Sequence, residues 1–361
     1  MNFQTRRKTV LAALVCVALG AAPALADSSI TPSKDRSTWP EGTPRSDAAV
    51  DLGRHLFFDP RLVLSEDQSC ASCHSPHAGY AGYAGYADGV ARDLTAHKNW
   101  KRAKRNSPTI YNLTDAPVVH WDGRTPTGQC LTAKDTRVET CLAPLEVQAF
   151  KSMRSRKIYE GFLPKVTAEA AYREMFKQAF PPNGDITHLN MALAIAAFER
   201  TLVSNDSAYD RYMAGERSAL SIEAKRGLAV YQGKGNCTAG HSGANLTDWQ
   251  FHNIGVDSDD EGRGAKLKTE AEKTEFRGAF KTPGLRNVAL TAPYMHNGSI
   301  GTLEAVVEFY DRGGDRKTNL SPLIQPLGLT DREKWDLVAF LNALTHTVDV
   351  QVPEVPGPAA R

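Results

Sequence analysis

Apolar residues recur at helical spacing after Asp185, at Ile186, Leu189, Leu193, Ala196 and Ala197. A spacing of three or four residues places such side chains on one face of an α-helix. Aspartate is a common residue at the N-terminus of a helix, where its side chain accepts a backbone N–H. The pattern therefore predicts a helix that begins after Asp185 and continues through FERTLV.

Two further stretches combine this periodicity with signals for where a helix begins and ends. SIEAKRGLAVYQG predicts a helix that begins at Ser221 and ends at Gly233. Thr330 and Glu333 have the spacing of a capping box, in which each side chain binds the other residue's backbone N–H. The helix expected after them has one apolar face, formed by Leu337, Phe340, Leu341 and Leu344.

The strict alternation of apolar and polar residues that is typical of strands is scarce in this chain. Residues 27–50 are polar with scattered prolines and predict an extended chain, and residues 51–150 predict many loops. The end of the chain, VPEVPGPAAR, cannot continue a helix, so residues 351–361 are expected to be a flexible tail. These patterns predict a mainly α protein with long loops.

The first 26 residues have the pattern of an export signal. A basic group, Arg6, Arg7 and Lys8, is followed by the apolar run VLAALVCVALGAA and by ALA before Asp27. The apolar run is too short to cross a bilayer with ease. We therefore expect the mature chain to be exported to the periplasm, with no segment that spans a membrane.

The charge of the chain is nearly balanced, and this restricts its binding partners only slightly. The 361 residues include 43 Lys and Arg and 41 Asp and Glu, and residues 1–26 hold three of the basic residues and none of the acidic ones. The mature chain then has a net charge of about −1, which implies no affinity for nucleic acid or for a bulk membrane surface. Its length is typical of two domains.

Five cysteines follow the predicted signal, at positions 70, 73, 130, 141 and 237. In an oxidising compartment, the nearby Cys130 and Cys141 are expected to form a disulfide, and two unpaired thiols are the alternative. If Cys70 and Cys73 have another role, Cys237 has no disulfide partner. A single cysteine in an exported protein is unusual unless it is bonded to something else.

Residues 70–74 read CASCH, which is the attachment motif of a c-type haem. Two cysteines at this spacing can each form a thioether with one haem vinyl group, and His74 then binds the iron as an axial ligand. The alternatives are a redox-active dithiol or half of a zinc site. The sequence has no second Cys-x-x-Cys that could complete a zinc site.

Residues 237–241 read CTAGH, which has the same frame with Gly240 in place of the second cysteine. In isolation this match could be chance. Its context favours a second haem site, because it follows a predicted helix and a glycine-rich turn, GKGN. If a haem binds here, Cys237 can supply one thioether at most, while His241 supplies the axial ligand.

Further blocks surround the two motifs: LGRHLFFDPRL before the first, RNSPTIYN and WDGR after it, ALAIAAFERTLVS between them, and KTPGLRNVALTAPYMHNGSIGTLEAVVEFYDRGG after the second. In these blocks and their order, the chain resembles the bacterial di-haem cytochrome c peroxidases and their MauG-like relatives. The resemblance implies two c-type cytochrome domains that pack face to face. We place the peroxidatic N-terminal domain at residues 27–165 and the electron-transfer domain at residues 166–350.

The resemblance also implies roles for individual residues. His74 is expected to be the proximal ligand of the haem at which hydrogen peroxide reacts, and His241 that of the haem that relays electrons. Trp121 matches the tryptophan between the two haems, although it could be an ordinary core aromatic. Asn106, Thr291 and Pro293 match the ligands of an interface calcium ion, the last two mainly through backbone carbonyls, or they could simply stabilise loops.

Tyr310 lies where the peroxidases proper have a methionine ligand on the second haem and where MauG-like relatives have a tyrosine. A thioether favours Fe(II), whereas an anionic phenolate favours Fe(III) or higher oxidation states. A haem with histidine and tyrosine ligands is therefore a poor acceptor of electrons from a small cytochrome. If Tyr310 only packs, Met295 is the alternative ligand.

The sequence departs from the family around the first haem. Aligned on Ala143-Pro144-Leu145, the positions of the distal glutamine and glutamate hold Thr140 and Phe150. Glu146 and Gln148 lie nearby as candidate acid–base residues, or as ordinary polar side chains. His97 lies about one residue from the position of a distal histidine ligand in some peroxidases, although an ordinary loop histidine is the commoner outcome.

The function expected from the resemblance is a MauG-like di-haem peroxidase that draws electrons from a protein donor or protein substrate. One alternative is a peroxide-detoxifying cytochrome c peroxidase that receives electrons from a small cytochrome or cupredoxin. A second is a non-enzymatic electron carrier with only the first haem. The expected assembly is a monomer or homodimer.

Overall fold

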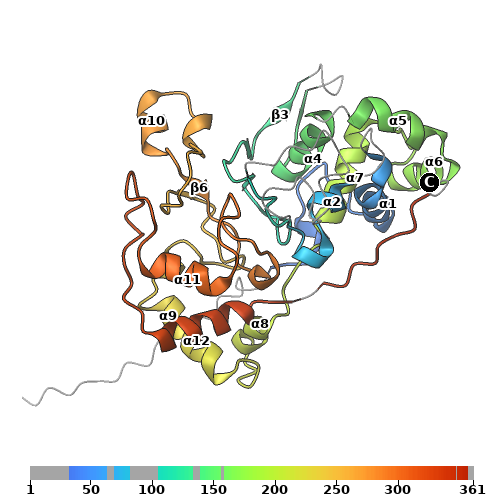
Figure 1. Ribbon diagram of the computed structural model, residues 1–361. Coiled ribbons are helices and arrows are strands. Elements are labelled where there is room, and N and C mark those ends of the chain that lie inside the picture. Colours follow the sequence, from blue (N-terminus) through green and yellow to red (C-terminus); the bar gives the residue numbers. More distant parts are fainter. Residues whose placement is uncertain are drawn as a thin grey trace, which may run out of the picture.

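The computed structural model describes residues 32–62, 69–81, 105–132, 139–155, 158–346 and 348–356, and these form two lobes (Figure 1). One lobe contains α1 (Asp47–Phe58), α2 (Cys70–Cys73), α4 (Pro144–Ser155), α5 (Ile158–Ala168), α6 (Ala170–Ala179) and α7 (His188–Glu199). The other contains α8 (Ala208–Met213), α9 (Ile222–Gln232), α10 (Glu270–Glu275), α11 (Leu303–Asp311) and α12 (Asp331–Asn342).

The segments between the helices contain short antiparallel pairs of strands. They are β1 (Val118–Val119) with β2 (Thr125–Pro126), β3 (Cys130–Leu131) with β4 (Thr140–Cys141), and β5 (Phe251–His252) with β6 (Phe280–Lys281). Long irregular segments separate these elements. The expected mainly α fold with long loops is confirmed.

The core of the N-terminal lobe forms where α7 packs against α1 and α4. Nearly every residue of α7 is buried, which agrees with its apolar character on all faces. Gly53 of α1 allows the closest approach, because a Cβ atom there would lie 1.8 Å from the carbonyl oxygen of Ala194. Any larger residue at this position would push the two helices apart.

The prediction of the ends of α7 was wrong at both ends. The helix is capped by Thr187, whose side chain accepts the N–H of Asn190, while the backbone carbonyl of Asp185 accepts the Asn190 side-chain amide. The helix ends at Glu199 and does not continue through FERTLV. The side chain of Arg200, the next residue, donates a hydrogen bond to the carbonyl of Thr114.

The C-terminal lobe is built on α9 and α12, and both predictions for these helices are confirmed. Ser221 caps α9, which ends before Gly233, and Thr330 and Glu333 form the capping box of α12. The helices cross closely at Gly227, where a Cβ atom would lie 1.9 Å from a backbone oxygen of α12. The expected apolar face of α12 is buried here: Leu337, Phe340, Leu341 and Leu344.

The structure has two hydrophobic cores, one in each lobe. Tyr172 and Phe176 of α6, the apolar residues of α7 and Leu202 all belong to the N-terminal core, and the C-terminal core begins at Tyr209. Within this arrangement, α6 packs against α1 of the first lobe. The predicted division between residues 165 and 166 stays a prediction.

The described part of the chain after α12 returns to the N-terminal lobe (Figure 1). Val348 and Val350 pack against the N-terminal core. Arg54 donates to the carbonyl of Gln351 at 2.9 Å, and Arg61 donates to that of Pro356. The described part of the expected flexible tail, residues 351–356, is thus hydrogen-bonded to the first lobe.

The predicted export signal, residues 1–26, lies outside the described residues. Within the described part of the chain, no helix has the length and apolar character needed to cross a membrane.

Candidate functional site

The CASCH motif forms α2 and the residue that follows it. The backbone N–H of His74 donates to the carbonyl of Cys70 at 2.9 Å, which closes the turn. His74 Nδ1 lies 3.1 Å from the carbonyl oxygen of Tyr80. Because a carbonyl can only accept, Nδ1 carries the proton, and Nε2 keeps the lone pair with which a neutral imidazole binds a metal.

The CTAGH motif has the same backbone arrangement. The N–H of His241 donates to the carbonyl of Cys237 at 2.8 Å, and His241 Nδ1 lies 3.0 Å from the carbonyl oxygen of Leu246. Tyr80 and Leu246 both have a positive φ, of 53° and 52°, which few residues other than glycine adopt. Two separate segments thus orient a histidine in the same way, although only one has two cysteines.

The backbone does not require glycine at position 240. Gly240 has a φ of −115°, which any residue can adopt. A Cβ atom there would have ordinary contacts, at 3.9 Å, with Asp248 and Thr282. Crowding therefore does not explain the missing sulfur, and the site has space for a larger side chain.

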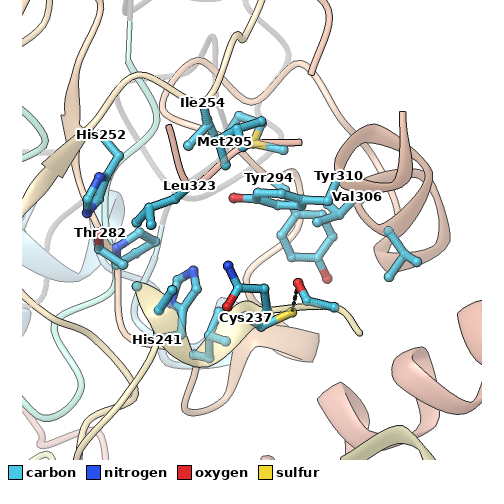
Figure 2. Close-up of a pocket in the computed structure, with 18 of the residues that line it drawn as sticks. Cys237, His241, His252, Ile254, Thr282, Tyr294, Met295, Val306, Tyr310 and Leu323 are labelled. Atoms are coloured by element: carbon cyan, nitrogen blue, oxygen red, sulfur yellow. Dashed lines mark hydrogen bonds between the residues drawn. The ribbon is translucent and has the colours of Figure 1, made fainter. Parts of the chain in front are cut away.

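His241 points into a cavity of about 210 Å³ in the C-terminal lobe. Figure 2 shows Cys237 and His241 on one side of this cavity, with Tyr294, Met295 and Tyr310 around the rest of it. Tyr310 comes from α11, and Tyr294 and Met295 come from the preceding loop. The structure therefore brings together the predicted second attachment cysteine, its histidine and both candidate axial ligands.

Burial favours the neutral forms of His241, Cys237 and the two tyrosines of this cavity. It lowers the pKa of His241, and it raises the pKa of Cys237 to about 11 and that of Tyr294 to about 12. Burial also raises the pKa of Tyr310. A neutral imidazole is the form that binds a metal, and a phenol buried here needs a nearby positive charge, such as ferric iron, to lose its proton.

Trp121 joins the two lobes at the wall of this cavity. Its indole N–H donates to the carbonyl of Asn106 at 2.9 Å, within the N-terminal lobe. Its carbonyl accepts the N–H of Lys281, on β6 of the C-terminal lobe, at 2.8 Å. Trp121 thus lies at the interface between the lobes, and its role between the haems stays a prediction.

The predicted calcium ligands lie at the same interface. Asn106 Nδ2 donates to the carbonyl of Pro293 at 2.8 Å, and Thr291 lies two residues before Pro293 on the same loop. Asn106 Oδ1 is buried and has no hydrogen-bond partner among the described residues. A buried oxygen without a donor, beside backbone carbonyls, fits the all-oxygen ligand set that calcium prefers.

A family model for di-haem cytochrome c peroxidase matches residues 47–218. The methylamine utilization protein MauG of Methylorubrum extorquens is 35% identical over 348 residues, which cover 93% of this chain and 92% of that protein. The cytochrome c551 peroxidase of Pseudomonas aeruginosa is 33% identical over 324 residues, which cover 87% of this chain and 83% of that protein. This chain belongs to the di-haem cytochrome c peroxidase family.

A solved structure supports the same assignment. A MauG-like protein associated with microbial copper homeostasis is 28% identical, with a TM-score of 0.69 over 87% of this chain and 93% of that chain. The expected family, fold class and enzyme class are thus confirmed. As a member of this family, the protein is a haem peroxidase of the oxidoreductase class, and its family implies two haems.

The candidate acid–base residues of this peroxidase lie on α4. Glu146 is buried and forms a bidentate ion pair with Arg200 at 3.0 and 2.9 Å, and it also accepts a hydrogen bond from Thr43. The side chain of Gln148 donates to Ser152. Both carboxylate oxygens of Glu146 are therefore engaged within the fold. His97 lies outside the described residues.

The two positions that align with the family's distal residues hold Thr140 and Phe150, whose side chains are not general acids or bases. Phe150 is buried and stacks on the ring of His188 at a centroid distance of 4.0 Å. Thr140 lies on β4, next to Cys141, which forms the predicted disulfide with Cys130 across the β3–β4 pair. The disulfide prediction is confirmed.

Two charged residues at the interface between the lobes were not predicted from the sequence. Arg105 forms ion pairs with Asp122 of its own lobe and with Asp260 of the other, each at 2.6 Å. Lys281 is buried beside Trp121 and lines the His241 cavity. In the sequence, Arg105 is the first residue of RNSPT and Lys281 is the first residue of KTPGLRNV, and charge alone does not show that a residue faces inward.

Proposed function

We propose that this protein is a periplasmic, MauG-like di-haem peroxidase. Hydrogen peroxide would be reduced at a haem bound by His74, and electrons would come from a protein donor through a second haem bound by His241. The observation that carries the proposal is that His241 has the same backbone-fixed orientation as His74 and faces a cavity that Tyr310 also lines.

The residues present fit two c-type haems. Cys70 and Cys73 would supply two thioethers to the first haem, and Cys237 would supply the single thioether of the second. His241 and Tyr310, which line the same cavity, would both be ligands of the second iron. When bound, the haems supply the redox chemistry, in which two electrons and two protons convert one peroxide molecule into two waters.

The protein's own groups hold and connect these sites. The carbonyls of Tyr80 and Leu246 fix the two histidine rings. Trp121 spans the interface, hydrogen-bonded to Asn106 on one side and to Lys281 on the other. A calcium ion bound by Asn106, Thr291 and Pro293 would hold the interface loops against each other.

A phenolate ligand distinguishes the MauG-like role from simple peroxide detoxification. An anionic oxygen stabilises the oxidised iron, so a second haem with Tyr310 would accept electrons poorly from a small cytochrome. Such a protein is better suited to removing electrons from a larger protein docked outside. Proton delivery at the first haem would use Gln148 or Glu146, and His97 is the candidate distal ligand of that haem; each of these roles stays a prediction.

Steady-state kinetics with hydrogen peroxide and a reduced small cytochrome c, or a reduced cupredoxin, separates the two peroxidase functions. The proposal predicts slow oxidation of these donors. Turnover on the order of hundreds per second, well within the ordinary range for enzymes, would instead identify a detoxifying cytochrome c peroxidase.

Low-temperature EPR of the holoenzyme tests the Tyr310 ligand. We expect Tyr310→Phe to remove the low-spin signal of the second haem, because phenylalanine has no ligand atom. Tyr294→Phe is the matched control, since Tyr294 lines the same cavity. An unchanged low-spin signal in Tyr310→Phe would exclude Tyr310 as a ligand.

A further inference from the structure

Lys281 is a buried cation with an incomplete set of partners. Its residue is 9% exposed on β6, and its ammonium group donates to the carbonyl of Thr282 at 3.0 Å. The same group lies 4.9 Å from the ring centroid of Trp249. Within the described residues it has no ion-pair partner closer than 4 Å. Burying a charge without a counterion is costly, so this arrangement calls for an anion.

The cavity around His241 has a marked charge pattern. Among the described residues that line it, Lys281 is the only lysine or arginine, and none is an aspartate or glutamate. The carboxylate whose field reaches Lys281 is that of Asp248, which is hydrogen-bonded to His252 at 2.8 Å. Burial lowers the pKa of Lys281 to about 8, which again shows that no strong counterion faces it.

The proposed occupant of this cavity supplies the missing charge. A haem is largely apolar, like the side chains that line the cavity, but it has two propionate groups that are anionic at neutral pH. We propose that Lys281 anchors the second haem by forming an ion pair with one of its propionates. This inference rests on the proposed second haem site and names a binding residue for it.

Such an anchor matters more here than in a site with two thioethers. With Gly240 in place of a cysteine, only Cys237 can attach the second haem covalently, and one bond leaves rotation about it. A propionate held by Lys281 would fix the haem at its edge, in addition to the thioether of Cys237 and the iron ligands His241 and Tyr310. The backbone N–H of Lys281 also bonds Trp121, so the same residue connects the haem edge to the interface between the lobes.

The ion pair would also affect electron transfer. A positive charge near a haem stabilises its reduced form, because reduction removes one positive charge from the iron. Without Lys281, the second haem is therefore expected to have a lower reduction potential. A lysine that only packs against Trp249 would have no effect on the vibrations of a propionate.

The test uses the holoenzyme and two variants, Lys281→Gln and Lys281→Met, so that one can replace the other if it folds poorly. Resonance Raman difference spectra report the bending band of the propionates, and a potentiometric titration reports the potential of each haem. Lys268→Gln is the matched control, because it removes the same charge from an exposed position in the same lobe. Lys281→Arg keeps the charge.

We expect both neutral variants to shift the propionate band and to lower the potential of the second haem, while Lys268→Gln and Lys281→Arg keep the wild-type values. Neutral variants that carry two haems and show the wild-type band and potential would overturn the role of Lys281. A wild-type protein with only one haem would instead overturn the proposed second site, and intact mass distinguishes this failure from the first.

Discussion

The two histidine motifs have the same backbone contacts, but the second lacks one of the two cysteine sulfur atoms. In each, the histidine N–H bonds the carbonyl of the first cysteine, and Nδ1 faces a carbonyl whose residue has a positive φ. The first motif has Cys73 at the position where the second has Gly240. The comparison indicates that the backbone, rather than the second cysteine, orients the ligand, so a motif can lose one attachment and keep its histidine in place.

The largest effect is expected from Cys237→Ser, which removes the only sulfur of the second motif. The second haem should then have no covalent bond to the protein, because serine does not form a thioether. Intact mass spectrometry under denaturing conditions should show the loss of one haem from every molecule. A second haem that stays covalently attached in this variant would show that Cys237 is not the attachment residue.

Cys73→Gly makes the first motif like the second. Cys70 should still hold the first haem through one thioether, with incomplete occupancy, and the carbonyl of Tyr80 should still orient His74. Intact mass reports the occupancy, and EPR of the first haem reports its ligation. A changed proximal ligation in this variant would show that the second cysteine, and not the backbone, positions the histidine.

Gly240→Cys makes the reverse change. The site has space for the new side chain, with the nearest atoms 3.9 Å from a Cβ atom, so a second thioether is expected. A short cross-link of this kind is worth about 2 kcal/mol by loop entropy, which corresponds to a rise of several degrees in Tm. The pyridine haemochrome spectrum should change to that of a haem with two thioethers.

Gly240→Ser is the control for this gain, because it adds a side chain of similar size that cannot form a thioether. It should keep the spectrum of a single attachment and the wild-type Tm within about a degree. If thiol alkylation still modifies the Gly240→Cys variant after haem insertion, the space at this position does not lie beside a haem vinyl group.

The smallest expected effect is on the pH dependence of stability, and it arises from a difference between buried carboxylates in the two lobes. In the C-terminal lobe the buried Asp210 pairs with Arg286 at 2.8 Å, whereas in the N-terminal lobe the buried Glu199 has no ion-pair partner within 4 Å among the described residues. Burial raises the pKa of Glu199 to about 8, from an ordinary value of 4.5. Between these pH values the folded state keeps a proton that the unfolded state has lost, so stability falls as the pH rises.

Glu199→Gln removes this titration and should therefore stabilise the protein more at pH 8 than at pH 5. The expected gain in Tm at pH 8 is a few degrees, since each kcal/mol shifts the Tm of a domain of this size by about 2–4 °C. Thermal unfolding at the two pH values measures it. A gain of equal size at both would mean that Glu199 is already ionised in the folded protein.

Local signals determined which parts of the fold were predictable. The ends of α9 and α12 depend on capping residues next to them, and Ser221 and Thr330 were identified correctly. The start of α7 was wrong because Asp185 and Thr187 are both suitable caps, and only the folded geometry shows which one is used. The packing of α6 against α1 had no local signal, because it is a long-range contact.

In the candidate site, too, some residues had a signal in the sequence and others depended on long-range packing. Cys237, His241 and Tyr310 carried signals in the sequence, as a motif or as part of a recognisable block, and the structure places them around one cavity. Lys281 belongs to one of these blocks as well, but nothing in the sequence showed its inward orientation, because this depends on the pairing of β5 with β6. The haem-attachment and calcium roles stay predictions until the holoenzyme is measured.

The central claim is that CTAGH holds a haem despite its missing cysteine. Intact mass spectrometry of the mature wild-type protein tests this most directly, because it counts covalently attached haems. The account predicts a mass that includes two haems, with a peptide containing Cys237 that carries one of them. A single haem, on the peptide with Cys70 and Cys73, and an alkylatable thiol at Cys237 would contradict it and leave a one-haem electron carrier.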